Sequence, residues 1–589
     1  MAGLATSFGS GAMTNSIGEI QDASCLLVIG SNTTEAHPII GLQVRRAVRK
    51  KGSKLIVVNP KEIDLCRIAD IWLRLRPGTD LALLNGLAHA ILRAGLQDTA
   101  FIEERTEGFD EWRASVERYT PELVSGITGV PAEQIELAAR IYATAGGMPG
   151  GSSCILYTMG ITQHTTGTDN VKAIANLAML TGNVGKPSAG INPLRGQCNV
   201  QGACDVGALP DVYTGYQRVD DERARARFER AWGCKLPSLP GLTLSEMVEV
   251  IDSGRIRAMY IMGENPLLSD PDVNHLKRSL ASLEFLVVQD IFLTETAALA
   301  DVVLPGASFA EKDGTFTNTE RRVQLVRKAI DPIGGARPDW QIVQELARRV
   351  ADRLGGAARS LAAGFDQDGP AEIMDEIASL TPSYAGISFA RLETGGLQWP
   401  VPTSDHPGTP ILHVGRFTRG RGLFSVVHYM PPAELPDEEY PLLLTTGRRL
   451  YHYHTGTMTR RVAGLNRLLD REYLQIHPSD AKRFGVVDGE KVVVSSRRGR
   501  ATCTAEVTPS VPEGVVFMDF HFGESPANVL TTPARDPVAK IAALKVCAVR
   551  VSGGDVGRLV GGREGEADAN DRWGEKSSSG DGSTAAILL

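Results

Sequence analysis

The stretch CLLVIGSN, residues 25–32, decides the fold. Five apolar residues are followed by Gly-Ser-Asn, which is typical of a buried strand that ends in a tight turn. HPIIGLQVRRAVRKKG (37–52) then shows helical spacing, a basic end and a glycine stop. KLIVVNP (54–60) and ADIWLRL (69–75) are the next apolar runs. Strands that alternate with helices predict a parallel sheet with helices on both faces.

A second stretch repeats this plan in the same order. AMYIMGEN (258–265), FLVVQD (285–290) and ADVVLP (300–305) match the three earlier strand segments. Any two Rossmann-like units look alike, but three matched segments favour a true repeat. We therefore expect an α/β fold with two related Rossmann-like units, at about 20–190 and 250–350. Ligands of such units lie at the carboxyl ends of the strands, where backbone amides face phosphates.

The rest of the sequence falls into segments that differ in composition. YPLLLTTGRR, EKVVVSSRRG, RATCTAEVTP and GVVFMDF read as short strands with turns between them, so residues 436–552 are expected to form a mainly-β barrel domain. The segment HPSDAKRFGV is one helix there, with Ser479 as its expected N-cap. Residues 355–435 are expected to be an irregular linker within a core of 1–435. The Gly/Ser-rich segment 553–589 is expected to be disordered.

Composition excludes several function classes. The 589 residues carry 62 basic and 69 acidic side chains, a net charge of -7, which argues against a nucleic-acid partner. No apolar run reaches membrane-span length and the first residues lack a signal-peptide pattern, so we expect a cytoplasmic protein. The eight cysteines form no C-x-x-C pair. They are therefore expected to be reduced thiols, not ligands of an iron–sulfur cluster or zinc ion within this chain.

The loop NPLRGQCNVQGACDVGALPD (192–211) has almost no hydrophobic periodicity, so something other than its own side chains must hold it. The guanidinium of Arg195 suits a carboxylate, although a structural arginine bound to loop carbonyls is an equally good interpretation. Cys198 and Cys204 are expected to be small buried thiols. Gln197 adds an amide to the same loop.

Two further loops are candidates for ligand contact. TTGRRLYHYHTGTMTRR (445–461) has two histidines two positions apart among four arginines. A metal site is disfavoured there by the arginines, and an anion such as a phosphate fits better than a solvated basic loop. DGTFTNTERRVQ (313–324) is typical of a loop that approaches a ligand by its backbone, or of an ordinary surface turn.

Taken together, these motifs resemble the catalytic subunit of molybdopterin-dependent formate dehydrogenases. PLRGQCNVQGACDVGALPD looks like the most distinctive segment of that family. MGITQ, ANLAMLTGNVGKP, YIMGENP, VVQDIF, ADVVLP, DGTFTNTERR and KVCAVRV follow in family order, so the resemblance covers about residues 2–551. Nitrate reductases share the fold, but NVQGACDVGALPD favours formate dehydrogenase.

The resemblance implies one molybdenum or tungsten ion held between two pyranopterin guanine dinucleotides. It implies formate as substrate, hydride transfer to the metal centre, and a partner subunit, iron–sulfur or NAD-linked, that takes the electrons. Arg195 would hold the formate carboxylate and Gln197 would line the pterin. The other cofactor contacts implied by the resemblance are Gly30, Asn32, His37, Asn59, Asp80, Gly160, Gln163, Gly263, Asn265, Gln289, Asp290, Thr294, Arg448, Arg449, His452, His454, Asn528 and Lys545.

The family pattern also contains an N-terminal four-cysteine domain for a [4Fe–4S] cluster and a following cysteine–histidine or selenocysteine–histidine pair. Neither stands in this sequence, so no metal ligand is assigned, and the cluster is expected only in a part that precedes Met1. We therefore expect an N-terminally truncated formate dehydrogenase, inactive alone, whose start was misplaced after a selenocysteine or cysteine codon. The alternatives are a non-catalytic pterin-binding remnant or another family member such as a nitrate reductase.

Overall fold

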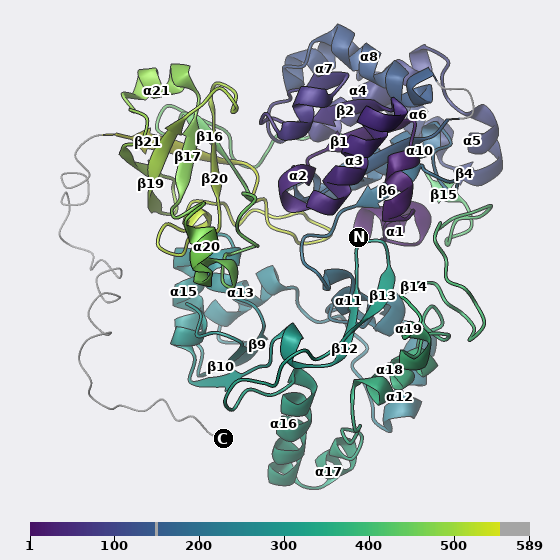
Figure 1. Ribbon diagram of the computed structural model, residues 1–589, viewed down its shortest axis with the longest axis vertical. Coiled ribbons are helices and arrows are strands. Elements are labelled where there is room, and N and C mark those ends of the chain that lie inside the picture. Colours follow the sequence, from purple (N-terminus) through teal and green to yellow (C-terminus); the bar gives the residue numbers. More distant parts are fainter. Residues whose placement is uncertain (148–150, 554–589) are drawn as a thin grey trace.

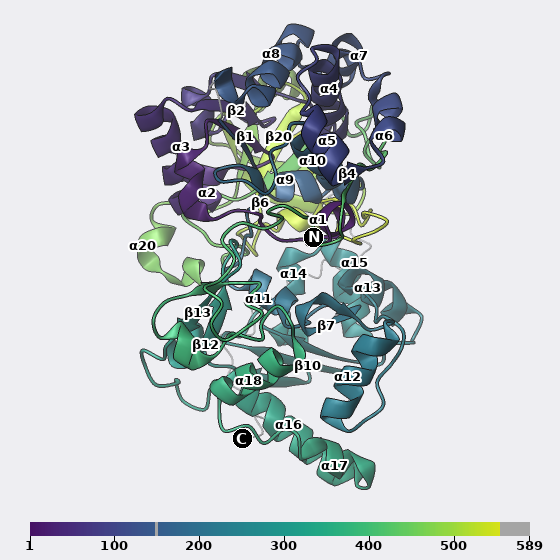
Figure 2. The ribbon, with the colours of Figure 1, turned by 90° about the vertical axis from the view of Figure 1, so that its right-hand side faces the viewer.

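A computed structural model of the chain describes residues 1–147 and 151–553 (Figure 1). It consists of two parallel-sheet units and a β-barrel, as the sequence predicts. The barrel lies beside the first unit in one view and behind it in the other, with the second unit below them both (Figure 2). The expectation of disorder beyond residue 553 falls outside the described residues. None of the described helices combines the length and the apolar composition that crossing a bilayer demands.

The first unit is built on a five-stranded parallel sheet. Its central strand β1 (Cys25–Ile29) pairs with β2 (Lys54–Val58) on one side and with β5 (Ser153–Tyr157) on the other. The outer strands are β3 (Ile71–Leu73) and β6 (Gly190–Pro193). After β1, the chain adds β2 and β3 on one side of it and then β5 and β6 on the other side. Such a reversal leaves a crevice between β1 and β5 at their carboxyl ends.

Helices cover the sheet of the first unit. They are α1 (Ala2–Phe8), α2 (Thr33–Ala36), α3 (Pro38–Lys51), α4 (Asp80–Arg93), α5 (Thr99–Arg105), α6 (Phe109–Val116), α7 (Pro121–Thr128), α8 (Ala132–Ala143), α9 (Met159–Thr162) and α10 (Gly167–Leu180). Nearly all residues of α10 are buried, including its two asparagines. Its buried amides are satisfied by backbone carbonyls: Asn170 donates to Ile161 and Asn176 to Ser425.

The second unit is smaller than the first. Its parallel sheet has three strands, β9 (Ala258–Met262), β10 (Phe285–Asp290) and β11 (Val302–Pro305), with β10 in the centre. The strands coincide with the three predicted segments, but the sheet is covered less completely than predicted, since Tyr260 and Met262 remain about half exposed. Its helices are α11 (Val200–Asp205), α12 (Glu222–Trp232), α13 (Leu244–Asp252), α14 (Pro266–Ser269), α15 (Val273–Ala281) and α16 (Asp339–Leu354).

The third part is a closed six-stranded barrel. Its strands, in order around the barrel, are β16 (Leu442–Gly447), β20 (Val515–Asp519), β17 (Tyr473–Ile476), β19 (Arg500–Val507), β18 (Lys491–Ser495) and β21 (Cys547–Ser552). Helices α20 (Ala463–Asn466) and α21 (Pro478–Phe484) connect them. The expected N-cap of α21 is wrong: His477 takes that place, and its Nδ1 accepts a hydrogen bond from the backbone of Ser479. Barrel and second unit share one hydrophobic core.

The segment between the second unit and the barrel, expected to be irregular, contains short helices and strands. It contains α17 (Ala357–Ala362), α18 (Pro370–Leu380), α19 (Phe389–Leu392), β14 (Leu397–Gln398) and β15 (Gly422–Leu423). Strand β14 extends the small antiparallel sheet of β12 (Gly314–Thr317) and β13 (Arg322–Val326), and β15 pairs with β4 (Thr106–Glu107) of the first unit. A further hairpin joins β7 (Val212–Tyr213) and β8 (Gln217–Arg218). The segment therefore runs back across the first unit before it enters the barrel.

Candidate functional site

A cavity of about 290 Å³ lies between the first unit and the barrel. One wall is the carboxyl edge of the first sheet, with residues that follow β1, β2 and β5. The opposite wall comes from β16, β20 and the loop after β16. The cavity thus occupies the crevice expected at the reversal point of the strand order. It brings together more than half of the predicted cofactor contacts: Gly30, Asn32, His37, Asn59, Asp80, Gly160, Gln163, Gln197, Arg448, His454 and Lys545.

Close backbone contact explains the glycine that ends the first strand. Gly30 has a φ of 57°, and a Cβ atom there would lie 2.8 Å from the carbonyl carbon of Gly160. The Gly30 carbonyl accepts hydrogen bonds from the amide of Gly160 at 3.1 Å and from the hydroxyl of Thr158 at 2.6 Å. The two turns at the floor of the cavity are therefore packed directly against each other, and only a residue without a side chain fits at either position.

Several cations, buried or half-buried, line the cavity. Arg448 and Lys545 line it, together with Lys61, which the sequence analysis missed. Burial lowers the pKa of Lys545 to about 7 and that of Lys61 to about 8. The nearest partners of Lys545 are neutral, since its Nζ donates to the carbonyl of Thr446 at 2.8 Å. Cations in a site that penalises charge favour the binding of an anion, which restores the electrostatic balance.

Acid and base groups with shifted pKa values share the same cavity. Burial raises the pKa of Asp80 to about 7 and lowers that of the missed residue His164 to about 4. The Nε2 atom of His164 lies 3.9 Å from a carboxylate oxygen of Asp80. Burial also lowers the pKa of His37 and takes that of His454 to about 4. The histidine rings of the cavity are therefore uncharged at neutral pH and can both donate and accept hydrogen bonds.

His37 connects the cavity to the loop at 192–211. Its Nε2 donates to the backbone carbonyl of Arg195 at 2.7 Å. Its Nδ1 is consequently an acceptor, and this buried atom has no hydrogen-bond partner within residues 1–147 and 151–553. An unpaired buried acceptor costs free energy, which a ligand with a suitable donor would recover.

Arg195 lies next to the cavity, between the lining residues Leu194 and Gly196. Its backbone amide donates to the hydroxyl of Thr319 at 3.0 Å. In the side chain, Nε donates to Gln201 at 3.2 Å and Nη2 lies 3.4 Å from the carbonyl of Gly11. Among the described residues, Nη1 makes no hydrogen bond. Arg195 therefore has features of a structural arginine and of a ligand-binding arginine. One edge of its guanidinium is held by the loop, and the other edge has a donor free for a ligand.

The cysteines of this loop differ from each other. Cys204 is buried, as expected, but Cys198 is exposed, so the expectation of two buried thiols is wrong for Cys198. The backbone of Cys198 donates to the hydroxyl of Tyr453 at 3.1 Å. The same hydroxyl donates to the sulfur of Cys198 at 3.9 Å, so the loop is fixed to the barrel although the thiol is exposed.

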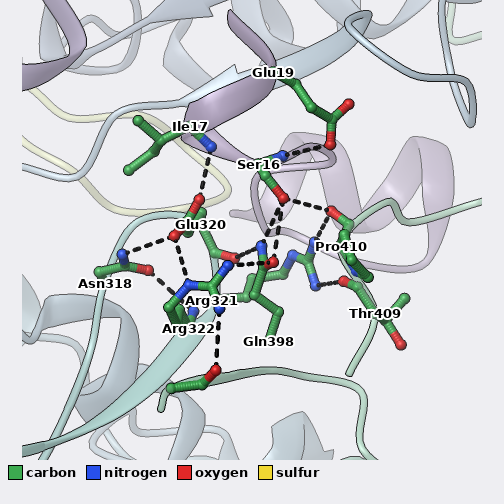
Figure 3. Close-up of polar contacts among 11 residues, drawn as sticks. Ser16, Ile17, Glu19, Asn318, Glu320, Arg321, Arg322, Gln398, Thr409 and Pro410 are labelled. Atoms are coloured by element: carbon green, nitrogen blue, oxygen red, sulfur yellow. Dashed lines mark hydrogen bonds and ion pairs between the residues drawn. The ribbon is translucent and has the colours of Figure 1, made fainter. Parts of the chain in front are cut away.

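The loop DGTFTNTERR supports the loop of Arg195. The backbone of Thr317 donates to the side chain of Asn199 at 2.8 Å, and the hydroxyl of Thr319 donates to the carbonyl of Pro193 at 2.7 Å. Arg321 is fully buried, which excludes an ordinary surface turn. Figure 3 shows its guanidinium beside Thr409 and Pro410, and it also donates to the carbonyls of residues 13 and 399.

The remaining predicted contacts lie away from the cavity. Five of them lie in or just after the carboxyl ends of β9 and β10 of the second unit: Gly263, Asn265, Gln289, Asp290 and Thr294. There Asn265 accepts from Thr296 and donates to Glu295 at 2.8 Å, and Gln289 donates to Asp339 at 2.6 Å. In the second unit, these side chains occupy the position that corresponds to the floor of the cavity in the first unit.

Three further predicted contacts have protein partners. Arg449 pairs with Glu506 at 2.6 Å and lies 3.3 Å from Asp519. The Nε2 atom of His452 donates to the carbonyl of residue 469 at 2.7 Å. Asn528 donates to the carbonyl of residue 268 at 2.8 Å, which joins the barrel domain to the second unit. Each of the three side chains stabilises the barrel or its contact with its neighbour.

Two protein-family models match this chain. The family model for molybdopterin oxidoreductase matches residues 3–349, and that for the molybdopterin dinucleotide binding domain matches residues 442–548. The chain is 50% identical over 554 residues to the alpha subunit of F420-dependent formate dehydrogenase from Methanocaldococcus jannaschii, covering 94% of this chain and 80% of that one.

A further relative and a solved structure are also similar to this chain. Formate dehydrogenase H from Escherichia coli is 41% identical over 558 residues, with 94% of this chain and 76% of that one covered. The solved structure of acetylene hydratase from Pelobacter acetylenicus has a TM-score of 0.73 at 20% identity and covers 94% of this chain and 80% of that chain. At this identity the likeness to acetylene hydratase concerns the fold.

Proposed function

The chain belongs to the molybdopterin oxidoreductase family, and from this premise we propose that it is the catalytic, alpha subunit of a formate dehydrogenase, which oxidises formate to carbon dioxide. One observation carries the substrate assignment. Relatives named as formate dehydrogenases share 41% to 50% of its residues over 94% of its length. Neither the nitrate reductase nor the non-catalytic alternative has a comparable observation in its favour.

The residues of the cavity fit a molybdopterin dinucleotide. The phosphates of such a group need cations and donors, which Lys61, Arg448 and Lys545 supply. The unpaired Nδ1 of His37 offers an acceptor to a pterin or guanine donor. Gly30 and Gly160 leave backbone, not side chains, at the crevice floor. We assign this cavity to one dinucleotide and the carboxyl ends of β9 and β10 to a second, with molybdenum or tungsten as the metal.

The bound metal–pterin group would supply the two-electron chemistry that accepts the hydride of formate. The protein's own contribution is to bind and orient the substrate. We assign the free edge of the Arg195 guanidinium to the formate carboxylate, because a planar fork of donors matches two carboxylate oxygens. Its other edge is fixed by Gln201, which limits the orientations available to a bound carboxylate.

Other subunits complete the enzyme in this proposal. Relatives of this chain carry the printed designation of subunit alpha, which implies further subunits. We propose that an iron–sulfur or NAD-linked partner takes the electrons, and that the complex works in the cytoplasm. A [4Fe–4S] cluster belongs to the same electron path.

The experiment is a substrate comparison on the anaerobically purified holoenzyme. Metal and pterin content are measured first, by elemental analysis and by fluorescence of the released oxidised pterin. Formate oxidation and nitrate reduction are then assayed with an artificial electron carrier. Formate-dependent reduction of the carrier supports the proposal. Nitrate turnover without formate turnover, in protein with full metal and pterin content, would replace it by the nitrate reductase alternative.

A further inference from the structure

The loop that carries Arg195 contains a buried carboxylate with an unusual set of partners. Asp205 is 1% exposed, and its two oxygens accept four hydrogen bonds from neutral side chains. Oδ1 accepts from Gln201 at 2.8 Å and from Tyr216 at 2.7 Å. Oδ2 accepts from Tyr384 at 2.7 Å and from Trp399 at 2.6 Å. Burial raises the pKa of Asp205, and these hydrogen bonds oppose that rise.

The carboxylate decides which way the amide of Gln201 faces. The amino group of Gln201 donates to Asp205 at 2.8 Å and to the hydroxyl of Tyr216 at 3.0 Å. Its carbonyl oxygen is thereby left for Arg195, whose Nε donates to it at 3.2 Å. A reversed amide would place an amino group against the N–H of Arg195, and two donors cannot form a hydrogen bond.

We propose that Asp205 is a positioning residue for formate, which orients the guanidinium of Arg195 through the amide of Gln201. This inference rests on the proposed function, in which Arg195 holds the substrate carboxylate. The two residues of the relay, Gln201 and Asp205, lie four positions apart on α11 and share its short helical frame. With Nε engaged by Gln201, Nη1 of the same planar group remains available to the carboxylate of formate.

The asparagine variant isolates this effect, because it keeps the volume of Asp205. The indole N–H of Trp399 can only donate, so the remaining oxygen of an asparagine must face Trp399. Its amino group then faces the amino group of Gln201. That conflict is relieved when the Gln201 amide reverses, and Arg195 loses the acceptor for Nε.

Four variants of the holoenzyme form the test: Asp205→Asn, Gln201→Met, the double variant, and Asp480→Asn as matched control. Asp480 is also 1% exposed and accepts a backbone hydrogen bond from Gly514 at 2.7 Å. It belongs to α21, at the end of the barrel distant from α11 (Figure 1). For each variant, kcat and KM for formate are measured, together with the melting temperature with and without formate in the absence of an electron acceptor.

Asp205→Asn is expected to raise the KM for formate about 10-fold and to change kcat less than about 3-fold. The reason is that formate is bound and oriented less well, while the chemical step itself is unchanged. The increase in melting temperature that formate causes should become smaller in the same variant. The double variant should equal Gln201→Met, since Asp205 acts through that residue. Asp480→Asn should lower the melting temperature and leave KM unchanged.

Three outcomes would overturn the inference. These are an unchanged KM in Asp205→Asn, an unchanged KM in Gln201→Met, or strictly additive effects in the double variant. If Asp205→Asn does not fold, Gln201→Met decides alone. Failure of the proposed function is distinguishable, because wild-type holoenzyme would then neither oxidise formate nor be stabilised by it.

Discussion

Replacement of Gly30 by alanine tests the account of the crevice floor. The residue has a φ of 57°, and its new Cβ atom would meet backbone atoms of Gly160 and Ile161 at 2.8 and 2.9 Å. The left-handed backbone costs about 1 kcal/mol with a side chain, and the overlap with rigid backbone adds about 1–3 kcal/mol. We therefore expect Gly30→Ala to lower the free energy of unfolding of the first unit by about 2–4 kcal/mol.

Two matched variants separate these contributions. Gly52 has a φ of 72° with nothing within 4 Å of an added Cβ atom, so Gly52→Ala reports the backbone cost alone. Gly160→Ala adds a Cβ atom 2.5 Å from the carbonyl oxygen of Gly30 without a left-handed φ, and reports the overlap alone. Native-state hydrogen exchange of the β1 amides gives the free energies, and pterin fluorescence gives the cofactor content. The reasoning is refuted if Gly30→Ala costs no more than Gly52→Ala.

Two further predictions concern buried cations. Burial lowers the pKa of Lys545 to about 7, so from pH 7 to about pH 10 the unfolded chain binds a proton that the folded apoprotein lacks, and stability rises with pH. Melting curves should show this rise and should flatten in Lys545→Met; an equal rise in both proteins would contradict it. Arg321→Met leaves several buried carbonyls without donors and should cost about 3 kcal/mol or more, whereas removal of the exposed Arg327–Glu393 pair by Arg327→Met should cost at most about 1 kcal/mol in urea unfolding.

Strands were the most predictable part of this fold. Runs such as CLLVI and KLIVV lie in the sheet interior, where packing on both faces requires continuous apolar sequence. Helix α10 is harder to predict, because asparagines are mostly exposed in folded proteins. In the structure both are buried: Asn170 donates to the carbonyl of Ile161, nine positions earlier, and Asn176 donates to that of Ser425. The partner of Asn176 is far away in the chain and leaves no mark on local sequence.

The candidate site was predictable where a motif directly follows a strand. Gly30, Asn59 and Gly160 come to the crevice because the carboxyl ends of parallel strands meet at one edge. Lys61 was missed because a lysine after a strand usually lies at the surface. Its burial depends on the barrel, whose Phe517 ring lies 3.8 Å from its Nζ. The order of the barrel strands could not be read from their sequences.

The most direct test of the central claim is the formate kinetics of Arg195→Lys beside the wild-type holoenzyme, normalised to metal and pterin content. A lysine keeps the charge but cannot hold two carboxylate oxygens in one plane. We predict that kcat/KM for formate falls at least about 100-fold while cofactor content stays at the wild-type level. Unchanged formate kinetics in a fully loaded Arg195→Lys enzyme would contradict the assignment of Arg195 and with it the proposed way in which this chain binds its substrate.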